Sequence, residues 1–317
     1  KIGDLSGQGR SLMGIGSTYY STGKQELALE YLETALAAQR KANDGRGQVS
    51  NLKFLGKIQR QNGEFSAAIE AHMAASRLAT SPINKARIQL EISQDLVAAN
   101  RPYEALETLT RANAVAAYTQ NRKLLADSLR VSAEAWLLTG QFEQSLSAFQ
   151  KASKSYQALG LGLAQSRAIF GSAKAARGMG HTKAAKEHAG LALKSVEKLR
   201  SQLIAPELRL FFLASRQEYY DFLIDTLMLL HEQSDDTSGE YLREALSVSE
   251  RSRARALVDL IHEASIDLDD TTDSETSERQ TLLYQNMAEN RHRLIRLLDK
   301  PDQAGLEQQI AAIKQEL

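Results

Sequence analysis

The histidines are the first residues to examine for chemistry, because the chain contains no cysteine. Without cysteine, the chain can supply neither a thiolate zinc site nor a thiol nucleophile. Of the six histidines, only His181 and His188 lie close together, seven residues apart. That spacing would suit one helix face, but Gly180 marks a turn directly before His181. We therefore expect no metal site, no cofactor site and no group of catalytic residues. We accordingly expect that the chain is not an enzyme.

Three arginines alternate with small residues late in the chain, at Arg251, Arg253 and Arg255. Alternate residues of a helix lie about 200° apart, so Arg251 and Arg255 share a face that Arg253 does not. The pair can bind carboxylates of a neighbouring domain at an interdomain junction. It can equally pair within its own helix, with Glu250 or with Asp259. Both interpretations stay open at the level of sequence.

The composition favours a helical protein with many small contacts. Of the 317 residues, 43% are hydrophobic but only 6% are aromatic. The 39 Lys and Arg balance the 39 Asp and Glu, which argues against a general nucleic-acid binder. No apolar run reaches the length of a membrane span, so we expect no membrane insertion. We expect a cytoplasmic location; a periplasmic or secreted one stays open because the chain begins at Lys1 rather than Met.

A pattern of small residues recurs along the first two thirds of the chain. In each copy a turn residue is followed by Ala or Ser five positions later and by Ala seven positions after that. Glycine or asparagine at the turn can adopt the left-handed conformation that ends a helix. Small residues let two antiparallel helices approach closely, and such hairpins must stack to bury their apolar faces. The turn residues are Gly23, Gly63, Asn100, Gly140 and Gly180, at spacings of 40, 37, 40 and 40.

This pattern resembles the tetratricopeptide repeat (TPR) family over about residues 9–200. Ile15, Gly16 and Tyr19 in the first copy, and Trp136 in the fourth, carry the likeness. The spacing near 40 exceeds the family's period of about 34, and six extra residues add about 9 Å of helix. The resemblance implies an all-α solenoid, a right-handed superhelix of five antiparallel hairpins over residues 1–203. A generic α-solenoid of another repeat type is the alternative.

In this family, positions two, five, nine and twelve of each first helix line the inner, concave face. Nine of the twenty residues mapped to these positions are basic and two are acidic, although the chain has no net charge. Such a face would attract an acidic protein or peptide. The alternative is that these cations are solvated or paired with neighbouring acids. The candidate binding residues are Arg10, Tyr20, Lys53, Lys57, Arg60, Arg87, Arg130, Arg167, Lys174 and Arg177.

The pattern changes after the fifth copy. Residues 204–264 predict a long helical hairpin that caps the array, with its first helix running from Pro206 to Leu230. Residues 265–278 are acidic and rich in Ser and Thr, which predicts an exposed polar loop. Residues 279–317 show helical stripes typical of a hairpin or coiled-coil linker, and these stripes permit self-association.

Two segments of this later region carry a second resemblance. Residues 249–257 (SERSRARAL) resemble the segment that joins TPR repeats to a CHAT domain, a caspase-like cysteine protease domain of bacterial proteins. Residues 227–231 (LMLLH) resemble an element upstream of such domains. The resemblance implies a sensor or adaptor arm that regulates, or recruits substrate to, a CHAT domain beyond Leu317. Arg251 and Arg255 would lie at that junction. A free-standing scaffold for complex assembly and a peptide-responsive TPR regulator are the alternatives.

Overall fold

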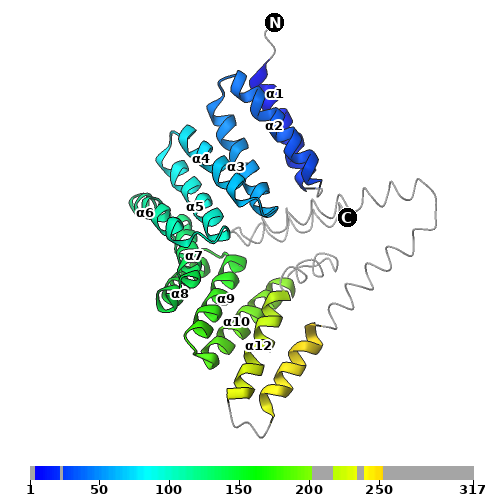
Figure 1. The fold of residues 1–317 in the computed structure, drawn as a ribbon, viewed down its shortest axis with the longest axis vertical. Coiled ribbons are helices and arrows are strands. Elements are labelled where there is room, and N and C mark those ends of the chain that lie inside the picture. The colour runs from blue at the N-terminus through cyan, green and yellow to red at the C-terminus, as the bar shows by residue number, and fades with distance from the viewer. Residues whose placement is uncertain (1–3, 22–23, 202–216, 234–238, 253–317) are drawn as a thin grey trace, which may run out of the picture. The chain divides into compact units, whose positions relative to one another are not determined.

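The computed structural model describes residues 4–21, 24–201, 217–233 and 239–252. Within these ranges the chain consists of α-helices joined by short turns, with no β-strand (Figure 1). The predicted all-α fold of antiparallel hairpins is therefore confirmed for this part of the chain. None of the helices in these ranges combines the length and the apolar character needed to cross a membrane.

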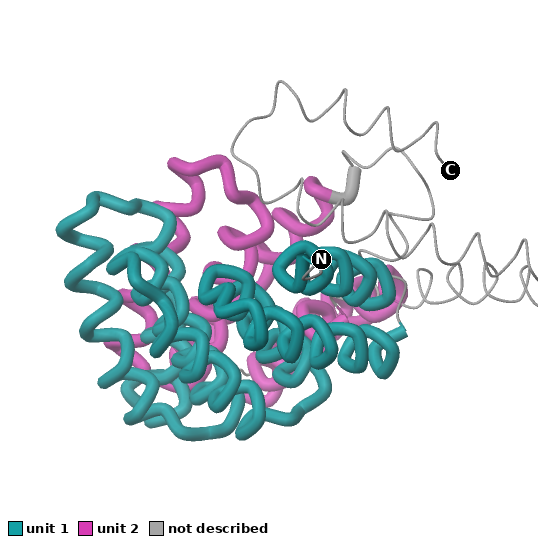
Figure 2. The backbone as a smooth tube through the Cα atoms, turned by 90° about the horizontal axis from the view of Figure 1, so that it is seen from above, with its two compact units in different colours: residues 1–141 teal, residues 142–317 magenta. Residues whose placement is uncertain are grey.

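The helices form two compact units, residues 1–141 and residues 142–317 (Figure 2). In unit 1 the helices are α1 Leu5–Ser21, α2 Gln25–Lys41, α3 Gly45–Gln61, α4 Phe65–Leu78, α5 Pro82–Ala98, α6 Pro102–Tyr118 and α7 Arg122–Leu138. In unit 2 they are α8 Phe142–Ala158, α9 Gly162–Gly178, α10 Thr182–Ser201, α12 Gln217–Gln233 and a helical segment at 240–252.

The helix lengths account for the repeat spacing. Most of the helices from α1 to α9 have 17 residues, and three residues separate each from the next. Two such helices with their two connections give the spacing of 40. Helix α4 has only 14 residues, three fewer, which explains the single spacing of 37. The connection after α4 also differs, because Ala79 is extended and Pro82 begins α5.

Left-handed residues occupy most of the described turns between helices. The turns within hairpins use the predicted residues, Gly63 (φ 80°), Asn100 (φ 58°), Gly140 (φ 74°) and Gly180 (φ 75°). Gly23 lies outside the described residues. The turns between hairpins use Asn43 (φ 53°), Gln120 (φ 51°) and Gly160 (φ 68°), which the repeat pattern did not single out.

The small residues of the pattern lie in the core. The residues five positions after each turn are fully buried, and so are those a further seven along: Ala28, Ala68, Ala105, Ser145 and Ala185, then Ala35, Ala75, Ala112, Ala152 and Ala192. A Cβ added at Gly16 would lie 2.9 Å from Leu32 Cγ, and one at Gly56 would lie 2.7 Å from His72 Cε1. The close helix approach predicted for these positions is therefore confirmed.

In unit 2, α12 and the segment at 240–252 pack on the preceding hairpin. Phe170 of α9 and Val196 of α10 share one core with Tyr219 and Leu227 of α12 and with Val248. Helix α12 is described from Gln217, so the start predicted at Pro206 falls among residues 202–216, outside the described ranges. The predicted acidic loop, the linker after it and Arg255 also lie outside them.

Candidate partner-binding surface

Each unit presents a surface formed by the first helices of its hairpins. In unit 1 these helices are α1, α3, α5 and α7, and in unit 2 they are α9 and α12. We call this surface the first-helix face of each unit. All ten residues predicted to bind a partner belong to α1, α3, α5, α7 or α9.

A network of ion pairs occupies the first-helix face of unit 1. On α3, Arg60 Nη1 lies 2.7 Å from Asp95 Oδ1, and Nη2 lies 2.9 Å from Glu91 Oε2, both carboxylates belonging to α5. Asp95 is fully buried, and its Oδ2 lies 2.5 Å from His72 Nδ1. His72 Nε2 lies 3.2 Å from the carbonyl oxygen of Lys53. His72 of α4 therefore bridges Asp95 of α5 and the backbone of α3.

The network continues from α5 to α7. With the amide of Gln94 oriented by its neighbours, its nitrogen donates to Glu91 Oε2 at 3.2 Å and its oxygen accepts from Arg130 Nη2 at 3.1 Å. Arg130 also pairs with Glu134 at 2.5 Å. Burial raises the pKa of Glu91, but the charge and hydrogen bond of Arg60 outweigh burial and hold that pKa below its ordinary value. Arg60 and Arg130 are thus paired within unit 1.

Lys57 and Tyr20 are brought together between α3 and α1. Lys57 Nζ lies 5.6 Å from the centroid of the Tyr20 ring. The ring is buried edge-on against Phe54, with centroids 5.3 Å apart, and its hydroxyl donates to Gln61 Oε1. The structure therefore holds an exposed cation against an aromatic ring whose position is fixed on two sides.

The other predicted residues of unit 1 lie apart from these contacts or at their edge. Arg10 lies near the start of α1, 3.9 Å from Asp4 and 4.0 Å from Asp44. Lys53 is half-buried beside the network. Arg87 is exposed, and no carboxylate oxygen of a described residue lies within 4.0 Å of it. Pairing with neighbouring acids, the alternative left open by the sequence, thus applies to some of these cations but not to Arg87.

In unit 2, two cations lie against aromatic rings of α9 and α12. The Arg177 guanidinium carbon lies 3.8 Å from the centroid of Phe222. Lys174 Nζ lies 4.4 Å from the centroid of Phe170 and 3.6 Å from Glu218 Oε2. The rings of Phe170 and Phe222 meet edge to face at 5.3 Å. The predicted residues Lys174 and Arg177 therefore form one cluster with side chains of α12.

The repeat pattern, which ends at residue 203, does not predict that α12 contributes to this face. Tyr219 stacks on Phe170, with centroids 4.0 Å apart, and Phe222 supports Arg177. The aromatic cluster at positions 219, 220 and 222 was the available signal. Arg167 is exposed, without a carboxylate within 4.0 Å in the described ranges, and Arg251 is exposed in the segment at 240–252.

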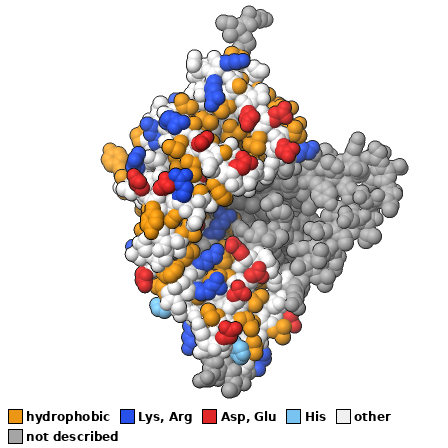
Figure 3. Space-filling model, viewed as in Figure 1, with side chains coloured by type: hydrophobic (Ala, Val, Ile, Leu, Met, Phe, Trp, Pro, Cys, Tyr) orange, Lys and Arg blue, Asp and Glu red, His pale blue; other side chains and the backbone are white. Residues whose placement is uncertain are grey.

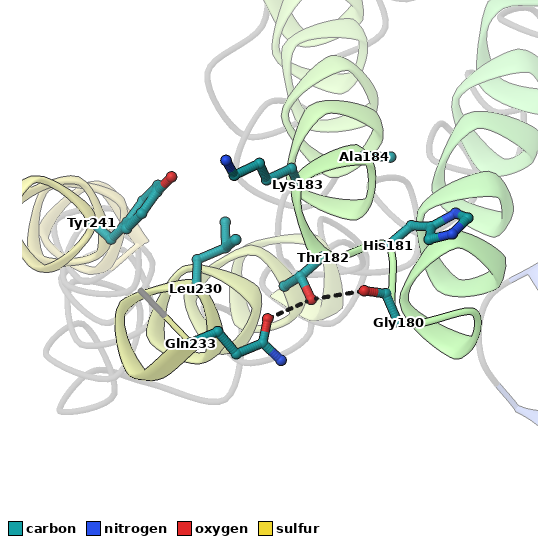
Figure 4. Close-up of a pocket in the computed structure, with 8 residues that line it drawn as sticks. All are labelled: Gly180, His181, Thr182, Lys183, Ala184, Leu230, Gln233 and Tyr241. Atoms are coloured by element: carbon teal, nitrogen blue, oxygen red, sulfur yellow. Dashed lines mark hydrogen bonds between the residues drawn. The ribbon is translucent and has the colours of Figure 1, made fainter. Parts of the chain in front are cut away.

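A pocket of about 530 Å³ lies where α10 begins and α12 ends (Figure 4). Thr182 Oγ1 donates to Gln233 Oε1 at 2.9 Å across its base, and Tyr241 lines the opposite side. Of the two histidines that lie close together in the sequence, His181 lines the pocket. His188 does not line it, and burial lowers the pKa of the His188 imidazole. Within the described ranges, no group of three or more His, Asp or Glu side chains is placed to hold a metal ion. The pocket thus has a hydrogen-bonded base but no metal-ligand set.

Acidic and basic side chains are mixed on the surface of both units in the view of Figure 3. Neither unit shows a continuous field of one sign on this side. Recognition of a charged partner would therefore depend on local groups of side chains, such as those around Lys57 and Arg177.

The chain is similar to known repeat proteins in one sequence segment and in fold. The family described as tetratricopeptide repeat matches residues 9–41, which contain most of α1 and all of α2. No curated protein is similar enough to count as a match.

Three solved structures illustrate the likeness in fold. BtubC (BKLC) from P. vanneervenii is 13% identical, with a TM-score of 0.54 over 80% of this chain and 92% of that one. The apo form of RapI is 11% identical, with a TM-score of 0.53 over 91% of this chain and 98% of that one. The nearly identical TPR-like kinesin light chain repeats of Podosopora anserina are 18% identical, with a TM-score of 0.51 over 63% and 99%. Together with the hairpin geometry, these likenesses identify the fold as a tetratricopeptide-like α-solenoid.

Proposed function

We propose that this chain is a non-catalytic module that binds an acidic protein segment on its first-helix faces. The observation that carries the proposal is the set of cations held against aromatic rings, Lys57 on Tyr20 in unit 1 and Lys174 and Arg177 on Phe170 and Phe222 in unit 2. Solenoids of this type bind partners along extended repeat surfaces. The tetratricopeptide segment at residues 9–41 supports protein or peptide binding as the general role.

The stacked cations suit carboxylate recognition for a physical reason. A guanidinium that stacks through its flat face keeps its N–H edges available for a carboxylate. A side chain that is already positioned also loses less conformational freedom when the partner binds. Arg87 and Arg167 add exposed positive charge, one in each unit, without a described carboxylate in contact. Each face therefore offers a positioned cation and a second cation that can attract an acidic partner.

A charge-reversal experiment on the full chain tests the proposal. We expect Arg167→Glu with Arg177→Glu to weaken the binding of a fluorescein-labelled oligo-glutamate peptide by at least about tenfold, measured by fluorescence anisotropy. The matched control is Lys151→Glu with Lys154→Glu, which makes the same charge change on exposed positions of α8. The control affinity should stay within about twofold of wild type. Equal affinities in the two variants would contradict the proposal.

Arg60 is unsuitable for this test, although it belongs to the predicted set. Replacing it would remove the Arg60 cation from the fully buried Asp95, and breaking a buried ion pair is strongly destabilising. A loss of binding in an Arg60 variant could then reflect unfolding. Arg167 and Arg177 avoid this difficulty, because neither has a described carboxylate partner.

The finer proposal is that the module serves a CHAT protease domain in a longer polypeptide, positioning a substrate or restraining the protease until a partner binds. It is supported by the likeness of residues 249–257 and 227–231 to segments found before such domains. The intact mass and sequence of the native polypeptide test it. A His and Cys pair in a following domain is expected. A native chain without such a domain would leave the free-standing scaffold, which predicts no binding of short peptides, or the peptide-responsive regulator.

A further inference from the structure

A second recognition surface lies in unit 1 between the second helices α4 and α6, with α5 beneath them. We call it the α4–α6 groove. Its volume is about 530 Å³, within the range of about 300–1,000 Å³ typical of ligand pockets. Ile69, Ile92 and Leu96 line it and are nearly buried, whereas Met73 beside them is 46% exposed. The groove thus offers an apolar floor that is accessible at Met73.

Three cations line the groove without ion-pair partners. Arg77 is in the last turn of α4, Lys85 is near the start of α5, and Arg111 is on α6; all three are exposed. No carboxylate oxygen of a described residue lies within 4.0 Å of any of them. Arg101, by contrast, is fully paired, with Nε and Nη2 each donating to Glu104 at 2.7 Å. The available charge of the groove is therefore positive and comes from Arg77, Lys85 and Arg111.

The groove is separate from the first-helix face, although α5 contributes to both. Lys85, Gln89, Ile92 and Leu96 follow one another at helical spacing and line the groove. The α5 residues of the ion-pair network, at positions 91, 94 and 95, lie on another side of the same helix. A ligand in the groove would therefore leave the first-helix face free.

We propose that the α4–α6 groove binds an extended acidic segment of a partner protein that carries an aliphatic anchor. The aliphatic side chain packs on the apolar floor at Met73, and the carboxylates pair with Arg77, Lys85 and Arg111. Charge complementarity selects this partner. Of the two described carboxylates that line the groove, Glu104 is held by Arg101, which leaves Glu107 against the three available cations. Helix α4, with 14 residues, is about 21 Å long, a length that about six extended residues cover.

The probe for the test is a fluorescein-labelled peptide of alternating aspartate and leucine, added to the full chain. We expect the bound peptide to slow amide hydrogen exchange in α4 and α6. Lys85→Glu with Arg111→Glu should remove that protection and weaken groove binding by at least about tenfold, while Lys151→Glu with Lys154→Glu should leave both unchanged. Met73→Ser, at an exposed position, should weaken binding about threefold or more, because it removes the apolar anchor site.

Two results would overturn the inference. One is protection of α4 and α6 that persists in Lys85→Glu with Arg111→Glu, since the cations would then not hold the peptide. The other is equal protection by a peptide with asparagine in place of aspartate. The location of the protected helices distinguishes this inference from the proposed function. Protection of α9 and α12 that depends on Arg167 and Arg177 reports the first-helix face, whereas protection of α4 and α6 reports the groove.

Discussion

Gly56 illustrates how one missing side chain allows two helices of a hairpin to pack. A Cβ at this position would lie 2.7 Å from Cε1 and 2.8 Å from Nε2 of His72. The imidazole cannot easily move away, because it is buried and contacts Asp95 and the Lys53 carbonyl. We expect Gly56→Ala to destabilise the protein by about 1–3 kcal/mol through overpacking, measured as a lower urea midpoint by circular dichroism.

The matched control for Gly56 is Gly14, also in the interior of a first helix. A Cβ at Gly14 would meet no atom within 4 Å. We expect Gly14→Ala to stabilise the protein by about 0.5–1 kcal/mol, because alanine favours the helix and restricts the unfolded chain. If both alanine variants raised the urea midpoint, the close contact between Gly56 and His72 would not exist in solution.

Glu91 predicts a pH dependence of stability. Burial raises the folded-state pKa of Glu91, but Arg60 outweighs burial and holds that pKa below the unfolded value of 4.5. The stabilisation by ionised Glu91 is therefore complete above about pH 4.5 and is lost as the pH falls through the folded-state pKa. The wild-type urea midpoint should drop more steeply below pH 4.5 than that of Glu91→Gln. Glu33→Gln, at an exposed position of α2, should follow wild type. Parallel curves for Glu91→Gln and wild type would contradict this coupling.

The ion-pair network also shows what sequence reasoning could not reach at the residue scale. The repeat spacing predicted that Arg60 belongs to a first helix, and in the structure it lies on α3. Its ion-pair partners, however, are 31 and 35 residues further along the chain, on α5. Pairing rules within one helix cannot find such contacts. One signal was present: Asp95 directly precedes the apolar residues 96–99, and a buried carboxylate requires a cation or hydrogen-bond donor.

At the scale of elements, the turns around α7 predict opposite effects of two substitutions. Gln120 adopts φ 51° and Gly140 adopts φ 74°. The left-handed conformation costs an ordinary residue about 1–2 kcal/mol, whereas glycine adopts it freely. We expect Gln120→Gly to stabilise the protein by up to about 1 kcal/mol and Gly140→Ala to destabilise it by about 1 kcal/mol, measured by urea denaturation. A loss of stability in Gln120→Gly would mean that the entropy of the added glycine outweighs the relieved strain.

The helix pattern was largely predictable because each hairpin repeats one set of local requirements. Turn residues such as Gly63 and Asn100 and buried residues such as Ala68 and Ala105 were found from spacing alone. Gln120 was not found, because glutamine has no special preference for a left-handed turn. The short α4 appeared in the sequence only as a spacing of 37, without an indication of which helix had lost a turn.

At the scale of the whole molecule, the sequence predicted an array of hairpins more readily than the surface that the array presents. Each hairpin is specified by neighbours within about 40 residues, whereas a surface combines residues from different hairpins. Arg177 was predicted as a binding residue, but its aromatic partner Phe222 was assigned to a capping hairpin. The apolar floor of the α4–α6 groove likewise combines helices that the repeat pattern treats separately.

An array of this kind predicts that damage stays local. In a solenoid each hairpin is stabilised mainly by itself and its nearest neighbours, so a defect should open only nearby helices. Gly56→Ala places a Cβ against His72 in the α3–α4 hairpin, and Gly171→Ala places one 2.4 Å from Phe149 between α8 and α9. We expect amide hydrogen exchange to accelerate mainly in α3–α6 for the first variant and in α8–α10 for the second. Equal acceleration along all described helices in either variant would show that the array unfolds as one cooperative unit.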